Sequence, residues 1–198
     1  MSLETLIAVA IFAFVASATP GPNNMMLLAS GVNFGFRRTI PHMVGIAFGF
    51  GVLVICIGMG LGALLQEFPI LELALKVAGG GYLLYLAFRI ALSRSLSSAS
   101  PEKARPMTLI GAALFQWVNP KAWMMAVSAI AIYADKEDPF VSVLFIALVF
   151  VIINFPSVSL WAGFGTALQG FLAHPQRLKW FNIGTGVLLA LCIVPMVA

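Results

Sequence analysis

The chain reads Thr19-Pro20-Gly21-Pro22-Asn23-Asn24 in the middle of its first hydrophobic run. Two prolines and a glycine interrupt a helix there and leave several backbone N–H and C=O groups without helical partners. Hydrocarbon offers no water to these groups, so a membrane tolerates such a break only where it lines a cavity walled by protein. The stretch therefore predicts a polar cavity inside a membrane-spanning bundle. The alternative, that the prolines end a short helix at a loop, leaves only ~16 residues to span the bilayer.

A second break occurs in a later hydrophobic run, at Asn119-Pro120-Lys121. Lys121 lies about 14 residues, or ~21 Å of helix, from either flank of that run, which places it near the middle of a bilayer. An ionisable side chain at that depth is costly and marks a functional site by default. The alternatives are a lysine that extends to the membrane interface, or a run with different limits.

The composition excludes an ordinary soluble domain. Hydrophobic residues make up 61% of the 198 residues and charged residues only 9%, which indicates an integral membrane protein in contact with the lipid bilayer. The formal net charge of +4 does not indicate nucleic-acid binding, because the basic residues lie at the ends of hydrophobic runs. No nucleic-acid partner, metal site or cofactor is expected.

Six hydrophobic runs are long enough to cross a bilayer at about 20 residues each. They cover roughly Leu6–Val32, Ile40–Leu65, Ile70–Leu92, Leu109–Tyr133, Phe140–Phe164 and Leu178–Val197. We predict an all-α membrane protein with about six transmembrane helices in a single domain over residues 1–198. The first and fourth helices are expected to be broken.

The predicted spans form two related halves, about 1–92 and 107–198, joined by a Ser-rich cytoplasmic linker over 93–106. Each half carries a proline break in its first span, and Gly- and Leu-rich stretches at 79–86 and 184–191 resemble each other. Three spans per half place the halves in opposite orientations. This is the inverted repeat common in secondary transporters.

Basic residues gather on one side of the predicted membrane. That side carries Arg37, Arg38, Arg89, Arg94, Lys103, Arg105, Arg177 and Lys179. The other side carries Glu4, Glu67, Glu72, Asp135, Glu137 and Asp138, with Lys76 and Lys136 as its basic residues. The positive-inside rule assigns the basic side to the cytoplasm. Both termini are therefore predicted to lie outside.

The helix that begins after the first break should present unpaired N–H groups and the positive end of its dipole to the membrane interior. With the Asn23 and Asn24 side chains, these donors suit a carboxylate. Lys121 adds positive charge, and Gln116 lies one helical turn from the second break. The candidate substrate-binding residues are Thr19, Pro20, Gly21, Pro22, Asn23, Asn24, Gln116, Asn119, Pro120 and Lys121.

These motifs resemble the signature of the lysine exporter/homoserine–threonine exporter (LysE/RhtB) family. The resemblance rests on Thr19 to Asn24, Gly35-Phe36-Arg37, Gly81-Tyr82-Leu83-Leu84-Tyr85-Leu86-Ala87 and Asn119-Pro120-Lys121-Ala122. It covers nearly the whole chain, and the doubled Asn23-Asn24 looks closest to the cysteine/O-acetylserine exporter branch. The resemblance implies a bacterial inner-membrane exporter of amino acids, coupled to proton entry, that associates as a homodimer.

Two other functions stay open. Cys56 and Cys192 lie inside hydrophobic runs, and paired intramembrane cysteines would suit a membrane-embedded thiol or electron carrier. A metal-ion exporter on the same scaffold would need carboxylates or histidines at mid-membrane, where Lys121 repels a cation. No Asp or Glu lies at the centre of any predicted span, so Lys121 itself is the candidate proton carrier.

Overall fold

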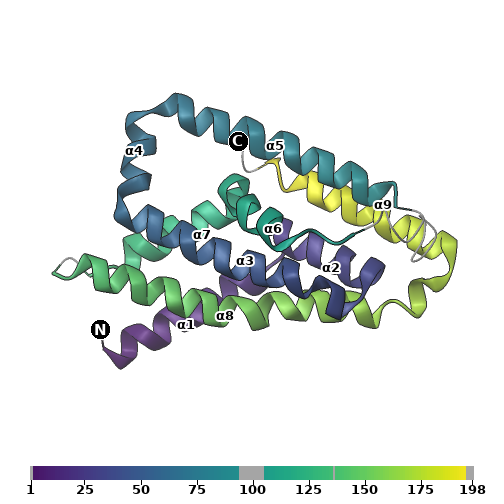
Figure 1. Cartoon of the computed structure of the whole chain (residues 1–198), viewed down its shortest axis with the longest axis horizontal. Helices are drawn as coiled ribbons and strands as arrows, with labels where there is room; N and C mark the ends of the chain where they lie inside the picture. The colour runs from purple at the N-terminus through teal and green to yellow at the C-terminus, as the bar shows by residue number, and fades with distance from the viewer. Residues whose placement is uncertain (1, 94–104, 136, 195–198) are drawn as a thin grey trace.

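The computed structural model describes residues 2–93, 105–135 and 137–194, and all regular structure in those ranges is helical. Most of the helices lie along one axis in an elongated bundle, and the short α4 runs across it (Figure 1). In chain order they are α1 (Leu3–Ala18), α2 (Pro22–Phe34), α3 (Phe36–Cys56), the π-helical turn η1 (Ile57–Leu61), α4 (Gly62–Glu67), α5 (Pro69–Ala91), α6 (Leu109–Phe115), the 3-10 turn η2 (Gln116–Val118), α7 (Pro120–Tyr133), α8 (Pro139–Ala167), the 3-10 turn η3 (Phe171–Ala173) and α9 (Pro175–Leu191).

Both predicted helix breaks are present. The first run forms α1 and α2, which are bent by 59° across residues 19–21. The fourth run forms α6 and η2 on one side of Asn119 and α7 on the other. In each case the second helix begins with a proline, whose missing N–H costs nothing at the first helical position.

The other predicted runs are also helical, with limits shifted by a few residues. The second run contains a kink that the sequence analysis did not predict, because Gly60 adopts a φ of 108° between α3 and α4. Glycine takes this left-handed conformation without steric cost. Most of the predicted linker, including Arg94 and Lys103, lies outside the described residues, as does the end of the sixth run.

Several helices meet the length and hydrophobicity that a membrane crossing needs. Within the described residues, three do so alone, over Phe36–Leu64, Leu73–Ala91 and Pro139–Ala167, and the bent pair of α1 and α2 does so together. Large apolar side chains on their outer faces are more than half exposed, including Phe48, Val77, Leu148 and Leu160. Such a surface suits lipid rather than water, so the chain is a multi-pass membrane protein.

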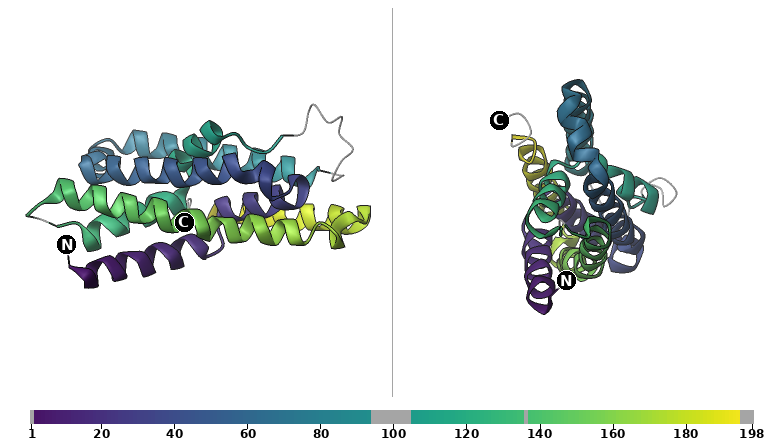
Figure 2. Two further views of the ribbon diagram at one scale, coloured as in Figure 1. Left: turned by 60° about the horizontal axis from the view of Figure 1, so that its bottom comes forward. Right: turned by 90° about the vertical axis from the view of Figure 1, so that its left-hand side faces the viewer.

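Helix α8 holds the first break in place. It packs along α1, α2 and α3, and Figure 2 shows it running the length of the bundle. The backbones of α2 and α8 touch, because a Cβ added at Gly31 would clash with the carbonyl of Ala162 and one at Gly165 would clash with the carbonyl of Leu28. Helices α5 and α9 pack mainly on each other, and they also contact η2 and α2, respectively.

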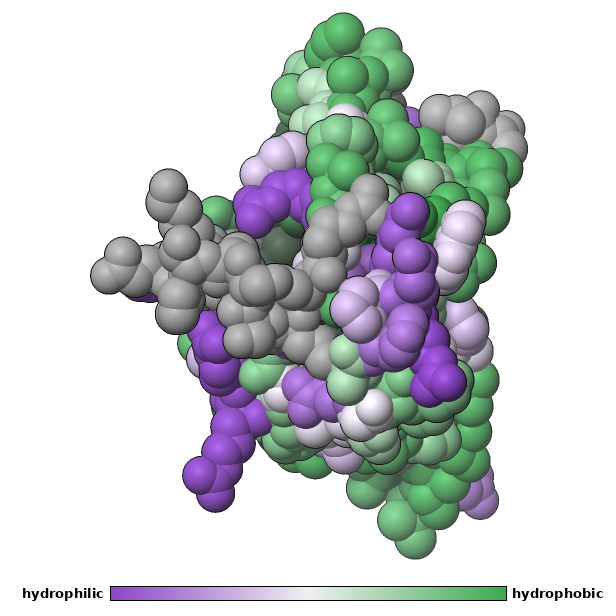
Figure 3. Space-filling model, turned by 90° about the vertical axis from the view of Figure 1, so that its right-hand side faces the viewer, coloured by the Kyte–Doolittle hydropathy of each residue, from purple (hydrophilic) through white to green (hydrophobic). Residues whose placement is uncertain are grey.

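The two ends of the bundle differ in charge. The α2–α3 corner, the end of α5, the extended segment that precedes α6 and the α8–α9 connection lie towards one end, on the right of Figure 1. These segments carry Arg37, Arg38, Arg89, Arg105, Arg177 and Lys179, while the other two basic residues in the described ranges, Lys76 and Lys121, lie elsewhere. Figure 3 shows hydrophilic residues gathered at this end. Glu4, Glu67, Asp135, Glu137 and Asp138 belong to segments at the opposite end.

Candidate functional site

The two helix breaks meet through Lys121. Its Nζ donates hydrogen bonds to the Thr19 carbonyl at 2.6 Å, the Thr19 hydroxyl at 2.8 Å and the Pro20 carbonyl at 3.3 Å. The ammonium therefore lies at the C-terminal end of α1, where the helix dipole favours a cation. The side chain is half-buried and turns towards the first break.

The carbonyl groups freed at the end of α1 all receive donors. Asn24 Nδ2 donates to the carbonyls of Ser17 at 2.8 Å and Thr19 at 2.7 Å. Trp161 of α8 donates its indole N–H to the Ala18 carbonyl at 3.0 Å. Side chains thus replace the water that a membrane interior lacks, and the break is stable without solvent.

The N-terminus of α2, in contrast, has free donors. Its N-cap residue is Gly21, which has no side chain to cap the helix, and Pro22 has no N–H. The backbone N–H groups of Asn23 and Asn24 have no hydrogen-bond partner among the described residues. These two donors and the positive end of the α2 dipole form a site suited to an anionic group.

The second break leaves no such donors. Asn119 is the N-cap of α7, and its side-chain oxygen accepts the Lys121 backbone N–H at 3.2 Å. Its carbonyl accepts the Ala122 N–H at 3.0 Å. The start of α7 is therefore satisfied within its own chain segment, and its contribution to the site is the Lys121 side chain.

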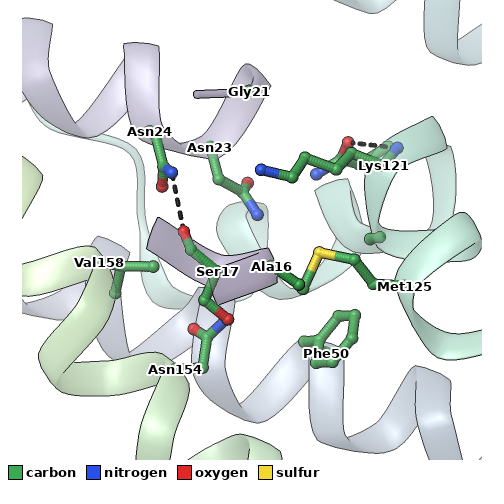
Figure 4. A pocket seen from close by; sticks show the side chains of 12 residues that line it. Ala16, Ser17, Gly21, Asn23, Asn24, Phe50, Lys121, Met125, Asn154 and Val158 are labelled. Atoms are coloured by element: carbon green, nitrogen blue, oxygen red, sulfur yellow. Dashed lines mark hydrogen bonds between the residues drawn. The ribbon is translucent and has the colours of Figure 1, made fainter. Parts of the chain in front are cut away.

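A small cavity of about 20 Å³ lies between the breaks (Figure 4). This volume suits about one water molecule, so the site is closed in this conformation. In Figure 4 the Lys121 side chain extends towards Gly21 and Asn23. The lining residues are Ala16, Ser17, Gly21, Asn23, Asn24, Phe50, Asn119, Lys121, Ala122, Met125, Asn154 and Val158.

Half of the candidate residues thus line this cavity. The others do not line it, but they contact the residues that do or begin the helices beside it. Thr19 and Pro20 accept the Lys121 ammonium, while Pro22 and Pro120 begin α2 and α7. Gln116 is fully buried and does not line the cavity.

Gln116 instead joins the two breaks through a reciprocal pair of amides. Asn23 Nδ2 donates to Gln116 Oε1 at 2.8 Å, and Gln116 Nε2 donates to Asn23 Oδ1 at 3.2 Å. Gln116 Nε2 also donates to the Ala112 carbonyl of α6 at 2.8 Å. The pair fixes the orientation of the Asn23 side chain at the cavity.

Sequence reasoning missed seven residues of the cavity wall, including Asn154, Phe50 and Met125. Asn154 of α8 donates to the Ser17 hydroxyl at 3.1 Å, and its buried Oδ1 has no partner among the described residues. An amide within a hydrophobic run was a signal that could have identified it. Phe50 of α3 and Met125 of α7 are apolar residues in apolar runs, and no sequence signal distinguishes them from core residues.

The comparison with known proteins decides the family. The chain matches the LysE type translocator family over residues 14–195. It belongs to this family. The resemblance carried by the two breaks is therefore confirmed, and this LysE-family protein is a translocator rather than an enzyme.

Two relatives of the LysE-family chain carry the same name. It is 28% identical over 187 residues to the cysteine/O-acetylserine efflux protein of Salmonella typhi, with 92% of each chain covered. It is 26% identical over 185 residues to the cysteine/O-acetylserine efflux protein of Escherichia coli K12, again with 92% of each chain covered. No solved structure matches the chain.

Family membership favours transport over the thiol-carrier alternative. Cys56 and Cys192 are both free cysteines. Within the described residues, no three His, Cys, Asp or Glu side chains gather where they could hold a metal ion. The polar groups at the breaks instead suit a small molecule that carries both charges.

Proposed function

We propose that this LysE-family protein exports small neutral amino acids or close derivatives across the bacterial inner membrane, with cysteine and O-acetylserine as first candidates. The substrates in the names of its relatives support this choice. The observation that carries the proposal is the meeting of the breaks, where Lys121 and the two residues with free N–H donors, Asn23 and Asn24, line one cavity. A zwitterion needs donors and acceptors at one place, and the breaks supply both.

The substrate would bind with its carboxylate at the start of α2. The N–H groups of Asn23 and Asn24 donate to that carboxylate, and Lys121 adds a charge-assisted hydrogen bond. The substrate ammonium donates hydrogen bonds to the carbonyls of Thr19 and Pro20. In the closed conformation these carbonyls accept hydrogen bonds from Lys121. Substrate binding thus releases Lys121 from the carbonyls and turns it towards the carboxylate.

The proposed transport cycle is alternating access between two inverted three-helix repeats, about 1–92 and 107–198. Helix packing supports this arrangement. Helix α1, before the first break, packs on α8, while α6, before the second, packs on α3. Helix α3 also packs on α8, and α5 on α9, as expected for equivalent helices related by a two-fold axis.

Membrane orientation is part of the proposal. The separation of charge between the two ends of the bundle supports a cytoplasmic position for the basic end, with both termini outside. Coupling to proton entry, with Lys121 as the carrier, and association as a homodimer extend the proposal, and the family resemblance supports them.

Liposomes with the purified protein test the proposal. Liposomes loaded with radiolabelled O-acetylserine, cysteine, threonine or lysine should release the first two fastest, and an acidic exterior should accelerate release. Protein-free liposomes are the control. Release of none of these amino acids above the control would contradict the proposed function. Equal release rates with and without the acidic exterior would contradict only the coupling of export to proton entry.

A further inference from the structure

A second cavity, of about 860 Å³, opens at the basic end of the bundle. It lies between α2 and α3 on one side and α5 and the start of α6 on the other. Its volume falls within the range of ~300–1,000 Å³ that is typical of small-molecule sites. We call this cavity the vestibule. Unlike the cavity between the breaks, it has room for an amino acid.

The vestibule wall is positively charged. Its charged residues are Arg89 and Arg105, and no Asp or Glu is among the described residues that line it. Arg89 Nη1 donates to the Tyr85 hydroxyl at 3.1 Å, and its guanidinium lies 5.8 Å from the centre of the Tyr85 ring. A guanidinium held in this way can bind a carboxylate through two parallel hydrogen bonds.

His42 adds a polar side chain without a partner. It lies in the vestibule wall and is only 2% exposed. Neither ring nitrogen has a hydrogen-bond partner among the described residues. A neutral imidazole offers one donor and one acceptor, and a buried group of this kind is costly unless something binds it. The acceptor nitrogen of His42 is unpaired but closed off by its neighbours in this conformation, so an ammonium reaches it only when the vestibule wall shifts.

Helix α2 connects the vestibule to the cavity between the breaks. Asn23 lines the inner cavity, while Met26, Ser30 and Asn33 line the vestibule. Spacings of three, four and three residues place all four on one face of α2. The Asn23–Gln116 amide pair lies where this face passes from one cavity to the other.

We propose that the vestibule is a second substrate site, which loads the amino acid from the cytoplasm before it reaches the breaks. Arg89 and Arg105 bind the carboxylate, and His42 accepts a hydrogen bond from the ammonium. This inference rests on the proposed function, because it takes the same substrate class.

Equilibrium binding of radiolabelled O-acetylserine to the full chain in phosphatidylcholine nanodiscs tests the inference. In the Lys121→Gln background, which disables the inner site, binding should persist. Adding Arg89→Gln and Arg105→Gln should weaken it roughly tenfold or more, because charge-assisted hydrogen bonds are lost. Arg177→Gln is the matched control, since Arg177 is a basic residue of the same end that lines neither cavity. The methyl ester of O-acetylserine should bind as weakly as the arginine variants bind the free acid.

Equal binding by the arginine variants and the Arg177→Gln control would overturn the vestibule site. Loss of binding when phosphatidylglycerol is added would also overturn it, by assigning the arginines to lipid headgroups. Should Lys121→Gln fail to fold, transport by the arginine variants with Lys121 intact replaces the test. The half-saturating concentration should rise about tenfold at an unchanged maximal rate.

His42→Leu separates binding from packing. It removes a buried polar group without a partner, so thermal stability should be kept or raised, while O-acetylserine binding weakens. Lower stability with unchanged binding would contradict the role of His42. If the wild type binds O-acetylserine but transports no amino acid, the proposed function fails while the vestibule site stands.

Discussion

The two helix breaks share a proline at the start of the following helix but differ in the residue that precedes it. When the two breaks are aligned at the proline that begins each following helix, Gly21-Pro22-Asn23-Asn24 aligns with Asn119-Pro120-Lys121-Ala122. At the second break an asparagine precedes the proline and caps its own helix. At the first break glycine has that position, and Asn24 reaches back to the carbonyls of α1 instead. The first break therefore keeps free N–H donors and the second does not.

The difference assigns complementary tasks to the breaks. The first provides the donors and acceptors of its backbone, and the second provides a cation on a satisfied helix. A lysine at the centre of a membrane helix costs ~2.5–3.5 kcal/mol on insertion scales. Three oxygen acceptors from Thr19 and Pro20 offset this cost. Each break thus stabilises the other, and substrate would compete for the same groups.

The largest effect is expected from Lys121→Met, which keeps the length of the side chain and removes its charge. Efflux of O-acetylserine from liposomes should fall about a hundredfold, because charge-assisted hydrogen bonds of ~1.5–3 kcal/mol each are lost. Lys179→Met is the matched control, since Lys179 lines neither cavity. Similar efflux from both variants would show that the second break contributes no functional cation.

Local chemistry made the breaks predictable from sequence. Proline and glycine interrupt helices wherever they stand, and the distance of Lys121 from both flanks placed it deep in the bundle before any packing was known. The cap formed by Asn119 follows from the same local rules, since asparagine before a proline at a helix start is a favoured N-cap.

The remaining features depend on the packing of distant segments. Asn154, Phe50 and Trp161 reach the first break only because α3 and α8 pass beside it. The amide pair of Asn23 and Gln116 needs a register between α2 and η2 that hydrophobic periodicity does not fix. The sequence analysis also predicted a single cavity. The vestibule between α2 and α5 depends on how these helices pack, and no local pattern of residues predicts it.

An intermediate effect is expected from Gly21→Ala at the first break. Gly21 has an extended backbone that any residue adopts, but an added Cβ would lie 2.6 Å from Lys121 Cδ. The flexible lysine can move aside, so the free energy of unfolding should change by less than about 1 kcal/mol. Displacing the ammonium should still slow efflux roughly tenfold or more. The pair of measurements is thermal unfolding and liposome efflux; loss of stability in proportion to activity would contradict this explanation.

The smallest effect is expected from replacing an asparagine by serine at each break separately, as Asn24→Ser and as Asn119→Ser. Serine caps a helix as well as asparagine does, so Asn119→Ser should change stability by only a few tenths of a kcal/mol. At position 24 the shorter serine cannot reach the Ser17 and Thr19 carbonyls, and two hydrogen bonds in a membrane interior are worth ~1–2 kcal/mol together. In nanodiscs, Asn24→Ser should therefore unfold at a lower temperature than Asn119→Ser. Equal losses would mean that both asparagines act as local caps, and the contrast between the breaks would disappear.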